Sequence, residues 1–188
     1  MANSAVSICN SAIVKLGGQR ITSLTDNTAI ARLCNEQFTK LRDEVLRSHP
    51  WNFALERAEL ASVAGFVDPL GEYNYKFQVP VNCLRVLNAS DSDTIWKREG
   101  NHILSNDSTF KIKYIKQVTD YALYDANFLE ALALRIAVDL SYAVMQSAKS
   151  SDQLWKAYKM VLSESRSLDA QEGTPDPVIV DDWTNARI

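Results

Sequence analysis

The stretch of sequence that decides the fold class is Tyr73-Asn74-Tyr75-Lys76-Phe77-Gln78, in which aromatic and polar side chains alternate. A period of two places successive side chains on opposite faces, so this stretch predicts a half-buried β-strand that ends before Pro80. Four more short segments are expected to be strands, namely residues 84–87, 94–98, 103–105 and 110–116. Turn residues at 100–101 and 106–107 separate the last three, which predicts an antiparallel meander of consecutive hairpins.

Helical periodicity precedes this β region. Apolar side chains recur at helical spacing from about Asn3 to Leu16, and Gly17-Gly18 is expected to stop this first helix. A polar turn at residues 26–28 offers a cap to a second amphipathic helix, which we expect to end near Ser48 because Pro50 follows.

Helical periodicity also follows the β region. After a cap at Asp125, residues from Asn127 to about Ser147 are apolar on most of the helix circumference, which predicts a helix at the centre of a bundle. Ser150 and Gln153 resemble a capping box for a last helix, which Gly173 is expected to end.

The order of these elements predicts an α+β fold, because the strands are bracketed by helices and do not alternate with them. We expect a helical bundle of about four helices with an inserted antiparallel β meander and an extended C-terminal arm. The expected boundaries are one α+β domain over residues 1–173, with helical parts at 1–50 and 125–172 and a β part at about 55–118. Residues 174–188, rich in proline at their start and apolar later, are expected to form the arm.

The composition limits the classes of function. The 20 basic and 23 acidic side chains nearly balance, so the chain has no overall positive field that would draw it onto nucleic acid or an anionic membrane. No stretch is apolar enough for us to expect membrane insertion. Cys9, Cys34 and Cys83 are far apart in the sequence, which is typical of reduced thiols in an apolar core. We expect no metal and no cofactor.

Catalytic signals are sparse. His49 and His102 are the two histidines, and neither follows a recognised nucleophile motif. Carboxylate pairs such as Glu56 with Glu59 leave a glycosidase open as the enzymatic alternative, because that reaction needs two acidic groups across a cleft. We expect a structural protein that assembles with copies of itself and with other proteins, not an enzyme.

Basic side chains gather in the expected β part. They are Lys97, Arg98, Lys111, Lys113 and Lys116. Lysines on a strand are typical of a protected sheet edge or a solvent-facing surface. The alternative is that they follow a phosphate backbone, as in a small DNA-binding packaging factor.

A further signal is the pair of aromatic residues Trp51 and Phe53, which directly follow the end of the second helix. Large rings at this position are expected to anchor the helix end against the β part.

Several segments, taken in their order and spacing, resemble the tail tubular protein A family, the head-to-tail adaptors of short-tailed bacteriophages. The segments are Ile8-Cys9-Asn10-Ser11-Ala12-Ile13-Val14-Lys15-Leu16-Gly17, Leu41-Arg42-Asp43-Glu44-Val45-Leu46, Trp51-Asn52-Phe53-Ala54, Tyr73-Asn74-Tyr75-Lys76-Phe77 with Pro80, Cys83-Leu84-Arg85-Val86 and Phe128-Leu129-Glu130-Ala131-Leu132-Ala133. The resemblance covers most of the chain.

The resemblance implies a dodecameric ring in the neck of the virion, made in the host cytoplasm and placed beneath the portal protein. It implies a β part that faces the tail nozzle protein and a lumen through which genomic DNA passes with only passive contact. A near-neutral chain suits such a conduit, because each phosphate neutralised would add affinity for DNA. The enzymatic alternative in this setting is a tail-associated cell-wall or polysaccharide hydrolase.

By the same resemblance the C-terminal arm is a portal-docking element. Its docking side chains are expected to be Val178, Ile179, Val180, Trp183, Arg187 and Ile188. Apolar and aromatic groups are the expected anchors because they dominate the energy of protein interfaces. The alternative is a frayed terminus.

Overall fold

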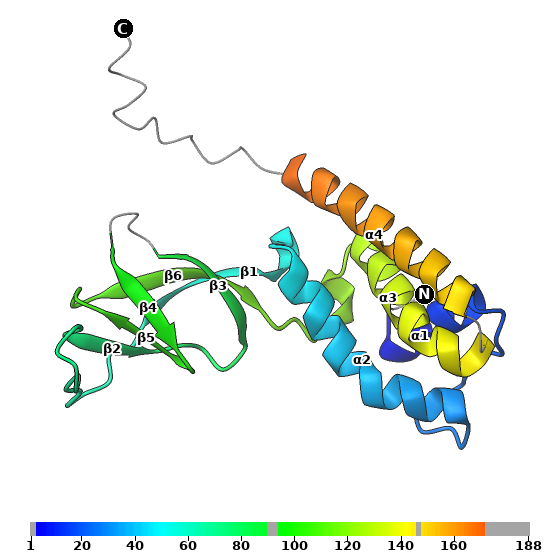
Figure 1. Ribbon diagram of the computed structural model, residues 1–188, viewed down its shortest axis with the longest axis horizontal. Coiled ribbons are helices and arrows are strands. Elements are labelled where there is room, and N and C mark those ends of the chain that lie inside the picture. The colour runs from blue at the N-terminus through cyan, green and yellow to red at the C-terminus, as the bar shows by residue number, and fades with distance from the viewer. Residues whose placement is uncertain (1–2, 90–93, 146–147, 172–188) are drawn as a thin grey trace, which may run out of the picture.

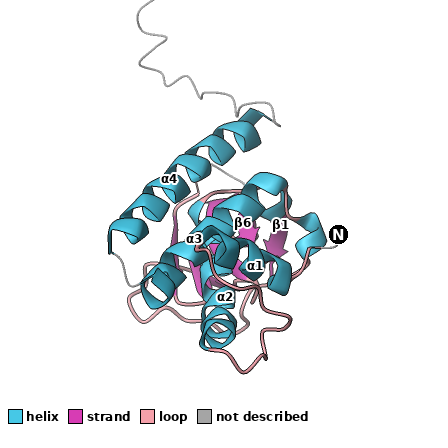
Figure 2. Cartoon of the chain, turned by 90° about the vertical axis from the view of Figure 1, so that its right-hand side faces the viewer, coloured by secondary structure: helices cyan, strands magenta, loops and turns pink. Residues whose placement is uncertain are grey.

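The computed structural model of the protein describes residues 3–89, 94–145 and 148–171. Helices form one part of the molecule and strands form the other, and the two parts lie end to end (Figure 1). Seen along the long axis, the helices stand in front of the strands (Figure 2). The predicted α+β class is therefore confirmed.

Four α-helices make up the helical part, as far as the chain is described. They are α1 (Ala5–Lys15), α2 (Ala29–Ser48), α3 (Ala126–Met145) and α4 (Ala148–Gln171). Helix α3 packs against the other three. Its buried side chains lie on most of its circumference: Phe128, Ala131, Leu132, Leu134, Ile136, Ala137 and Leu140. The prediction of a central helix is confirmed.

Local signals set most of the helix ends. Helix α1 ends in a Schellman motif, in which the Gly18 and Gly17 amides donate to the carbonyls of Ile13 and Val14, and Gly17 has a φ of 70°. The Asp125 carboxylate accepts a hydrogen bond of 2.6 Å from the Phe128 amide, which caps α3 as predicted.

The predicted start of the last helix is wrong. Helix α4 begins at Ala148, so Ser150 and Gln153 lie inside it and do not form its capping box. Ala148 and Lys149 are both strong helix formers, and the helix therefore extends past Ser150 toward its N-terminus.

The described strands form two three-stranded antiparallel sheets. The strands are β1 (Leu55–Leu60), β2 (Tyr75–Gln78), β3 (Cys83–Ala89), β4 (Trp96–Glu99), β5 (His102–Ser105) and β6 (Phe110–Lys116). The order is β1-β6-β3 in the first sheet and β2-β5-β4 in the second. Two predicted features are corrected by this topology.

First, the strands do not form one meander. Strands β4 and β5 make the predicted hairpin around Gly100, which has a φ of 57°. After β5, however, the turn at 106–109 carries the chain into the other sheet, where β6 pairs with β1 and β3. The physical reason is burial, because two facing sheets enclose a core of their own: Leu60, Phe77, Val79, Ile103, Phe110, Ile112 and Tyr114.

Second, strand β1 was not expected. It continues into the second sheet, because the Val63 amide donates to the Lys76 carbonyl at 2.7 Å and the Gln78 amide donates to the Ala61 carbonyl at 3.1 Å. The two sheets are thus joined along one edge through β1 and β2.

The β part is fixed to the helices at one end of the first sheet. Ile115 is buried in the helical core, with Leu55 and Leu84 packed beside it. Next to this contact, the Asp43 carboxylate of α2 accepts a hydrogen bond of 2.7 Å from the Gln117 side chain, just beyond β6. One end of the β part is therefore covered, and the opposite end projects away from the helices (Figure 1).

Candidate assembly surfaces

The aromatic pair that was expected to anchor α2 lies in the helical core. Trp51 is fully buried, and its indole Nε1 donates a hydrogen bond of 3.1 Å to the Val45 carbonyl. Its ring centroid lies 5.2 Å from that of Phe128 on α3, and the Phe53 ring lies 5.1 Å from the same ring. The pair therefore anchors the end of α2 against α3. The same apolar cluster also includes Ile115 of β6, with Leu55 and Leu84 packed against it.

A group of polar contacts joins the end of α4 to this same region. The Asp169 carboxylate lies 2.9 Å from His49 Nε2 and accepts a hydrogen bond of 3.0 Å from the Asn52 amide. The Asn52 side chain donates to the Asp169 carbonyl at 2.8 Å, and Arg166 donates to the Ser48 carbonyl at 3.0 Å. These contacts hold the C-terminal end of α4 beside the start of β1.

The end of the β part that projects from the helices carries exposed apolar side chains. We call them the distal edge, which consists of Val63, Val67, Leu70 and Ile95. Val67 is 82% exposed, Leu70 79% and Ile95 76%. Exposed apolar side chains that gather at one end of a molecule are candidates for a binding surface.

The loop that presents the distal edge is held by the Asp68 carboxylate. That carboxylate accepts hydrogen bonds from the amides of Leu70, Glu72 and Tyr73 at 3.1, 2.8 and 2.9 Å. These bonds lower the pKa of Asp68 below its usual range. Asn106 bonds the same loop, accepting from the Asn74 amide and donating to the Glu72 carbonyl. Exposure of Val67 and Leu70 is therefore a feature of a hydrogen-bonded loop.

Helix α4 also carries exposed apolar side chains, namely Trp155, Met160 and Leu168, which are spread around the helix. The Trp155 ring is flanked by two cations, since the guanidinium of Arg135 and the ammonium of Lys159 lie 5.5 and 5.3 Å from its centroid. The inner side of α4 packs on α3 through Tyr158 and Leu162. The exposed apolar residues of α4 thus lie on the helical part, apart from the distal edge.

The basic residues of the β part are mostly paired with acidic side chains. Lys97 pairs with Glu99 at 3.3 Å, Lys111 with Glu59 at 3.7 Å and Lys116 with Glu56 at 3.1 Å. Arg98 bonds the Gly100 carbonyl. These contacts fit the expected solvent-facing, charge-balanced surface.

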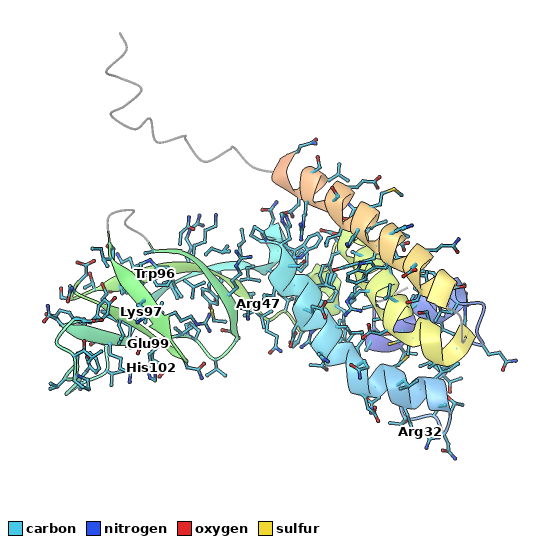
Figure 3. The ribbon with its side chains drawn as sticks, viewed as in Figure 1. Arg32, Arg47, Trp96, Lys97, Glu99 and His102 are labelled. Carbon is cyan, nitrogen blue, oxygen red and sulfur yellow. The ribbon has the colours of Figure 1, made fainter. Side chains whose placement is uncertain are left out.

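Three labelled basic side chains lie in different places on the molecule. Figure 3 shows Lys97 on the β4–β5 hairpin, Arg47 where α2 meets the β part and Arg32 toward the other end of α2. No single basic face emerges from these labelled residues.

One part of the β surface is different and forms a groove of about 560 Å³ on the outer face of the first sheet. We call it the basic groove. Its polar lining residues are Arg57, Glu59, Asn88, Lys111 and Lys113. Three cations therefore face one carboxylate in this groove.

The candidate catalytic residues do not come together. His49 lies in the helical core region and His102 on the β4–β5 hairpin. Glu56 and Glu59 are three residues apart on one strand, so their side chains point to opposite faces of the sheet. They are therefore not a facing pair across a cleft.

Cys9 and Cys34 are neighbours in the helical core, and Cys83 is partly buried. The hydrogen bond to the adjacent Cys34 thiol, together with burial, raises the pKa of the Cys9 thiol. In the described part of the chain, no three His, Cys, Asp or Glu side chains are arranged to hold a metal ion. None of the described helices is long and apolar enough to cross a membrane.

All six side chains predicted to dock on the portal, from Val178 to Ile188, lie outside the described residues. The same holds for Gly173, the predicted end of the last helix.

No protein-family model and no curated protein matches the chain, so comparison with known proteins does not assign it to a family.

Sequence reasoning missed two features of these surfaces. The contact between His49 and Asp169 joins residues 120 positions apart, and no local pattern signals it. The basic groove draws Arg57 from a strand that was not expected, whereas Lys111 and Lys113 were noted as part of a basic cluster. If Leu55–Leu60 had been predicted as a strand, it could have been expected to pair with the strand that contains Lys111 and Lys113.

Proposed function

We propose that the chain is a structural virion protein that forms the head-to-tail adaptor ring between the portal protein and the tail nozzle protein, with DNA passing through the lumen. The proposal combines the family resemblance of the sequence with the surfaces of the folded subunit. It places the protein in the neck of a short-tailed bacteriophage particle.

The observation that carries the proposal is the distal edge. Val67 and Leu70 are exposed on a loop that Asp68 fixes through three backbone hydrogen bonds. A fixed loop loses little conformational entropy on binding, so exposed apolar groups on it are well suited to a partner surface. In an adaptor this end of the β part would bind the nozzle protein.

A second argument comes from the separation of the surfaces. The distal edge lies at the free end of the β part, whereas the exposed apolar residues of α4 lie on the helical part. A ring subunit needs different surfaces for its neighbouring copies and for other proteins, because head-to-tail contacts between copies close the ring. Exposed apolar groups on both the β part and α4 of one chain fit that requirement.

The hydrolase alternative gains no support from the geometry. Glu56 and Glu59 each pair with a lysine, at 3.1 and 3.7 Å, and they face opposite sides of the sheet. Incubation of the protein with peptidoglycan or capsular polysaccharide tests this alternative, and turnover lost on changing Glu56 or Glu59 would overturn the structural proposal.

The test of the adaptor role uses portal-bearing capsids and the nozzle protein. The Val67→Asp/Leu70→Asp variant should still bind the capsids but fail to recruit the nozzle protein, as measured by co-sedimentation. Deletion of residues after Gly173 should instead prevent attachment to the capsids.

A matched control is Val81→Asp, because Val81 is fully exposed at the other end of the β part, beside the start of β3. This variant should recruit the nozzle protein as the unmodified chain does. Normal nozzle recruitment by the Val67→Asp/Leu70→Asp variant would contradict the role given to the distal edge.

A further inference from the structure

The basic groove brings like charges together without an evident structural gain. Arg57 on β1 lies directly opposite Lys113 on β6 in the strand register. Side chains at such positions have Cβ atoms about 4.5–5.5 Å apart, and like charges there destabilise the strand pair. The repulsion between Arg57 and Lys113 therefore destabilises the sheet by itself, and an anion bound in the groove would reduce that repulsion.

Acidic side chains of the described residues do not neutralise this pair. Across the part of the chain that the structure describes, no carboxylate lies within ion-pair distance of Arg57 or Lys113. The one carboxylate in the groove is Glu59, which lies 3.7 Å from Lys111, and both of those side chains are more than half exposed. The groove therefore keeps an excess of positive charge.

The segment that follows α4 has the opposite charge. Residues 172–188 contain Glu172, Asp176, Asp181 and Asp182 against Arg187, which gives a net charge of −3. The whole chain also has a net charge of −3, so the rest of the chain is neutral and this segment carries the entire excess of negative charge.

The end of α4, which precedes this segment, is tied to the chain just before the first strand that lines the groove. Asp169, close to the end of α4, accepts a hydrogen bond from the Asn52 amide, three residues before β1 begins. From Asn52 to Arg57 the chain can span at most about 18 Å, whereas the 17 residues of the segment can span up to about 60 Å. From Asp169, the seven residues to Asp176 can span up to about 25 Å, so the tether is long enough to bring Asp176, Asp181 and Asp182 to the groove.

We propose that the acidic segment 172–188 docks in the basic groove of its own chain, with the carboxylates of Asp176, Asp181 and Asp182 against Arg57, Lys111 and Lys113. Charge complementarity and the short tether carry this inference, which goes beyond the adaptor role and does not depend on it. In a subunit that has not met its partners, the groove would keep this segment from binding elsewhere.

Zero-length cross-linking of the full chain tests the proposal directly. A carbodiimide joins a carboxylate to a lysine amine only where the two are in contact, and mass spectrometry identifies the joined residues. The sample is an equal mixture of unlabelled and ¹⁵N-labelled protein, so that links within one chain are distinguished from links between chains. We expect links within one chain from Asp176, Asp181 or Asp182 to Lys111 or Lys113.

Three changes should remove these links. They should be lost in the Asp176→Asn/Asp181→Asn/Asp182→Asn variant, which leaves every described residue intact. They should also be lost in about 1 M salt, where the Debye length falls to about 3 Å. The Arg57→Glu variant should lose most of them, although both lysine amines remain.

The matched control is Arg32→Glu, which makes the same charge change at an exposed position on α2, away from the groove (Figure 3). It should keep the links. Absence of the links in the unmodified protein, links only between chains, or equal links in the Arg57→Glu and unmodified proteins would each overturn the proposal. If the Arg57→Glu variant kept the cross-links but lost binding to duplex DNA, the proposal would be overturned, and the groove would instead bind nucleic-acid phosphates.

Discussion

The His49 imidazole and the Asp169 carboxylate, 120 residues apart in the sequence, meet at 2.9 Å where the ends of α2 and α4 converge. Both side chains are largely buried, and the edge of the His49 ring packs against Trp51 with centroids 5.0 Å apart. The same carboxylate bonds the Asn52 amide, so one acidic side chain links the last helix to the entrance of the first sheet.

Replacement of Asp169 by alanine should therefore lower the free energy of unfolding. The loss should be about 1.5–3 kcal/mol, because hydrogen bonds to a buried charged group are broken. Urea denaturation followed by circular dichroism measures it. The control is Asp152→Ala, since Asp152 is exposed on the same helix, and an equal loss in both variants would contradict the role of Asp169.

Trp51 should contribute more to stability than any exposed tryptophan. Trp51→Ala removes a fully buried ring and should cost about 3–5 kcal/mol of unfolding free energy. Trp51→Phe retains part of the ring contact with Phe128 and should cost less, which keeps the test useful if the alanine variant does not fold. Thermal denaturation compares both with Trp155→Ala, which removes a ring that is 37% exposed and should have a smaller effect.

Alkaline pH should destabilise the protein through Tyr124. Burial raises the pKa of Tyr124 above its usual range, and its hydroxyl donates a hydrogen bond of 2.6 Å to the Val118 carbonyl. A raised pKa means that the stabilisation is complete below the pKa of an unfolded tyrosine, about 10, and is lost as the pH rises above that value.

The measurement is the free energy of unfolding between about pH 9 and 11 for the unmodified chain and for Tyr124→Phe. Above the pKa of the unfolded tyrosine, the unmodified chain should lose up to about 1.4 kcal/mol per pH unit more than the variant does. Tyr75→Phe, at an exposed position on β2, is the control. Parallel curves for Tyr124→Phe and the unmodified chain would contradict the assignment.

The loop of the distal edge should depend on Asp68. In Asp68→Ala, the amides of Leu70, Glu72 and Tyr73 lose their acceptor, so their hydrogen exchange should become faster while exchange in α3 is unchanged. In the unmodified chain the same loosening should appear as the pH falls through the lowered pKa of Asp68, since protonation removes the carboxylate that accepts these bonds. Exchange rates that are the same in the variant would show that other contacts hold the loop.

The elements with local signals could be predicted from the sequence. Asp125 caps α3, the Gly17-Gly18 pair ends α1, and the apolar circumference of α3 predicts its central place. These features depend on residues within one or two helical turns of one another. Local sequence contains that information, which is why the helical part was predicted well.

The pairing of the strands could not be predicted in the same way. Strand β6 leaves its sequence neighbour β5 because Phe110, Ile112 and Tyr114 must face the second sheet to be buried. Strand β1 has Glu56 and Ala58 on its inward face, so its sequence lacks a clear alternation of apolar and polar residues. Both outcomes depend on contacts between distant segments.

The candidate surfaces follow the same division. Burial of Trp51 and Phe53 could be predicted from their type and position, but their partner on α3 could not. The distal edge depends on how Asp68 folds its loop, and the basic groove on which strands lie side by side. Neither surface has a signature within a single segment.

The central claim, that the chain assembles into a ring as an adaptor subunit, is tested most directly by electron microscopy of the purified full-length protein, alone and mixed with the portal protein of the same virus. The account predicts closed rings of this chain stacked on the portal. A chain that remains monomeric under both conditions and leaves the portal bare would contradict it.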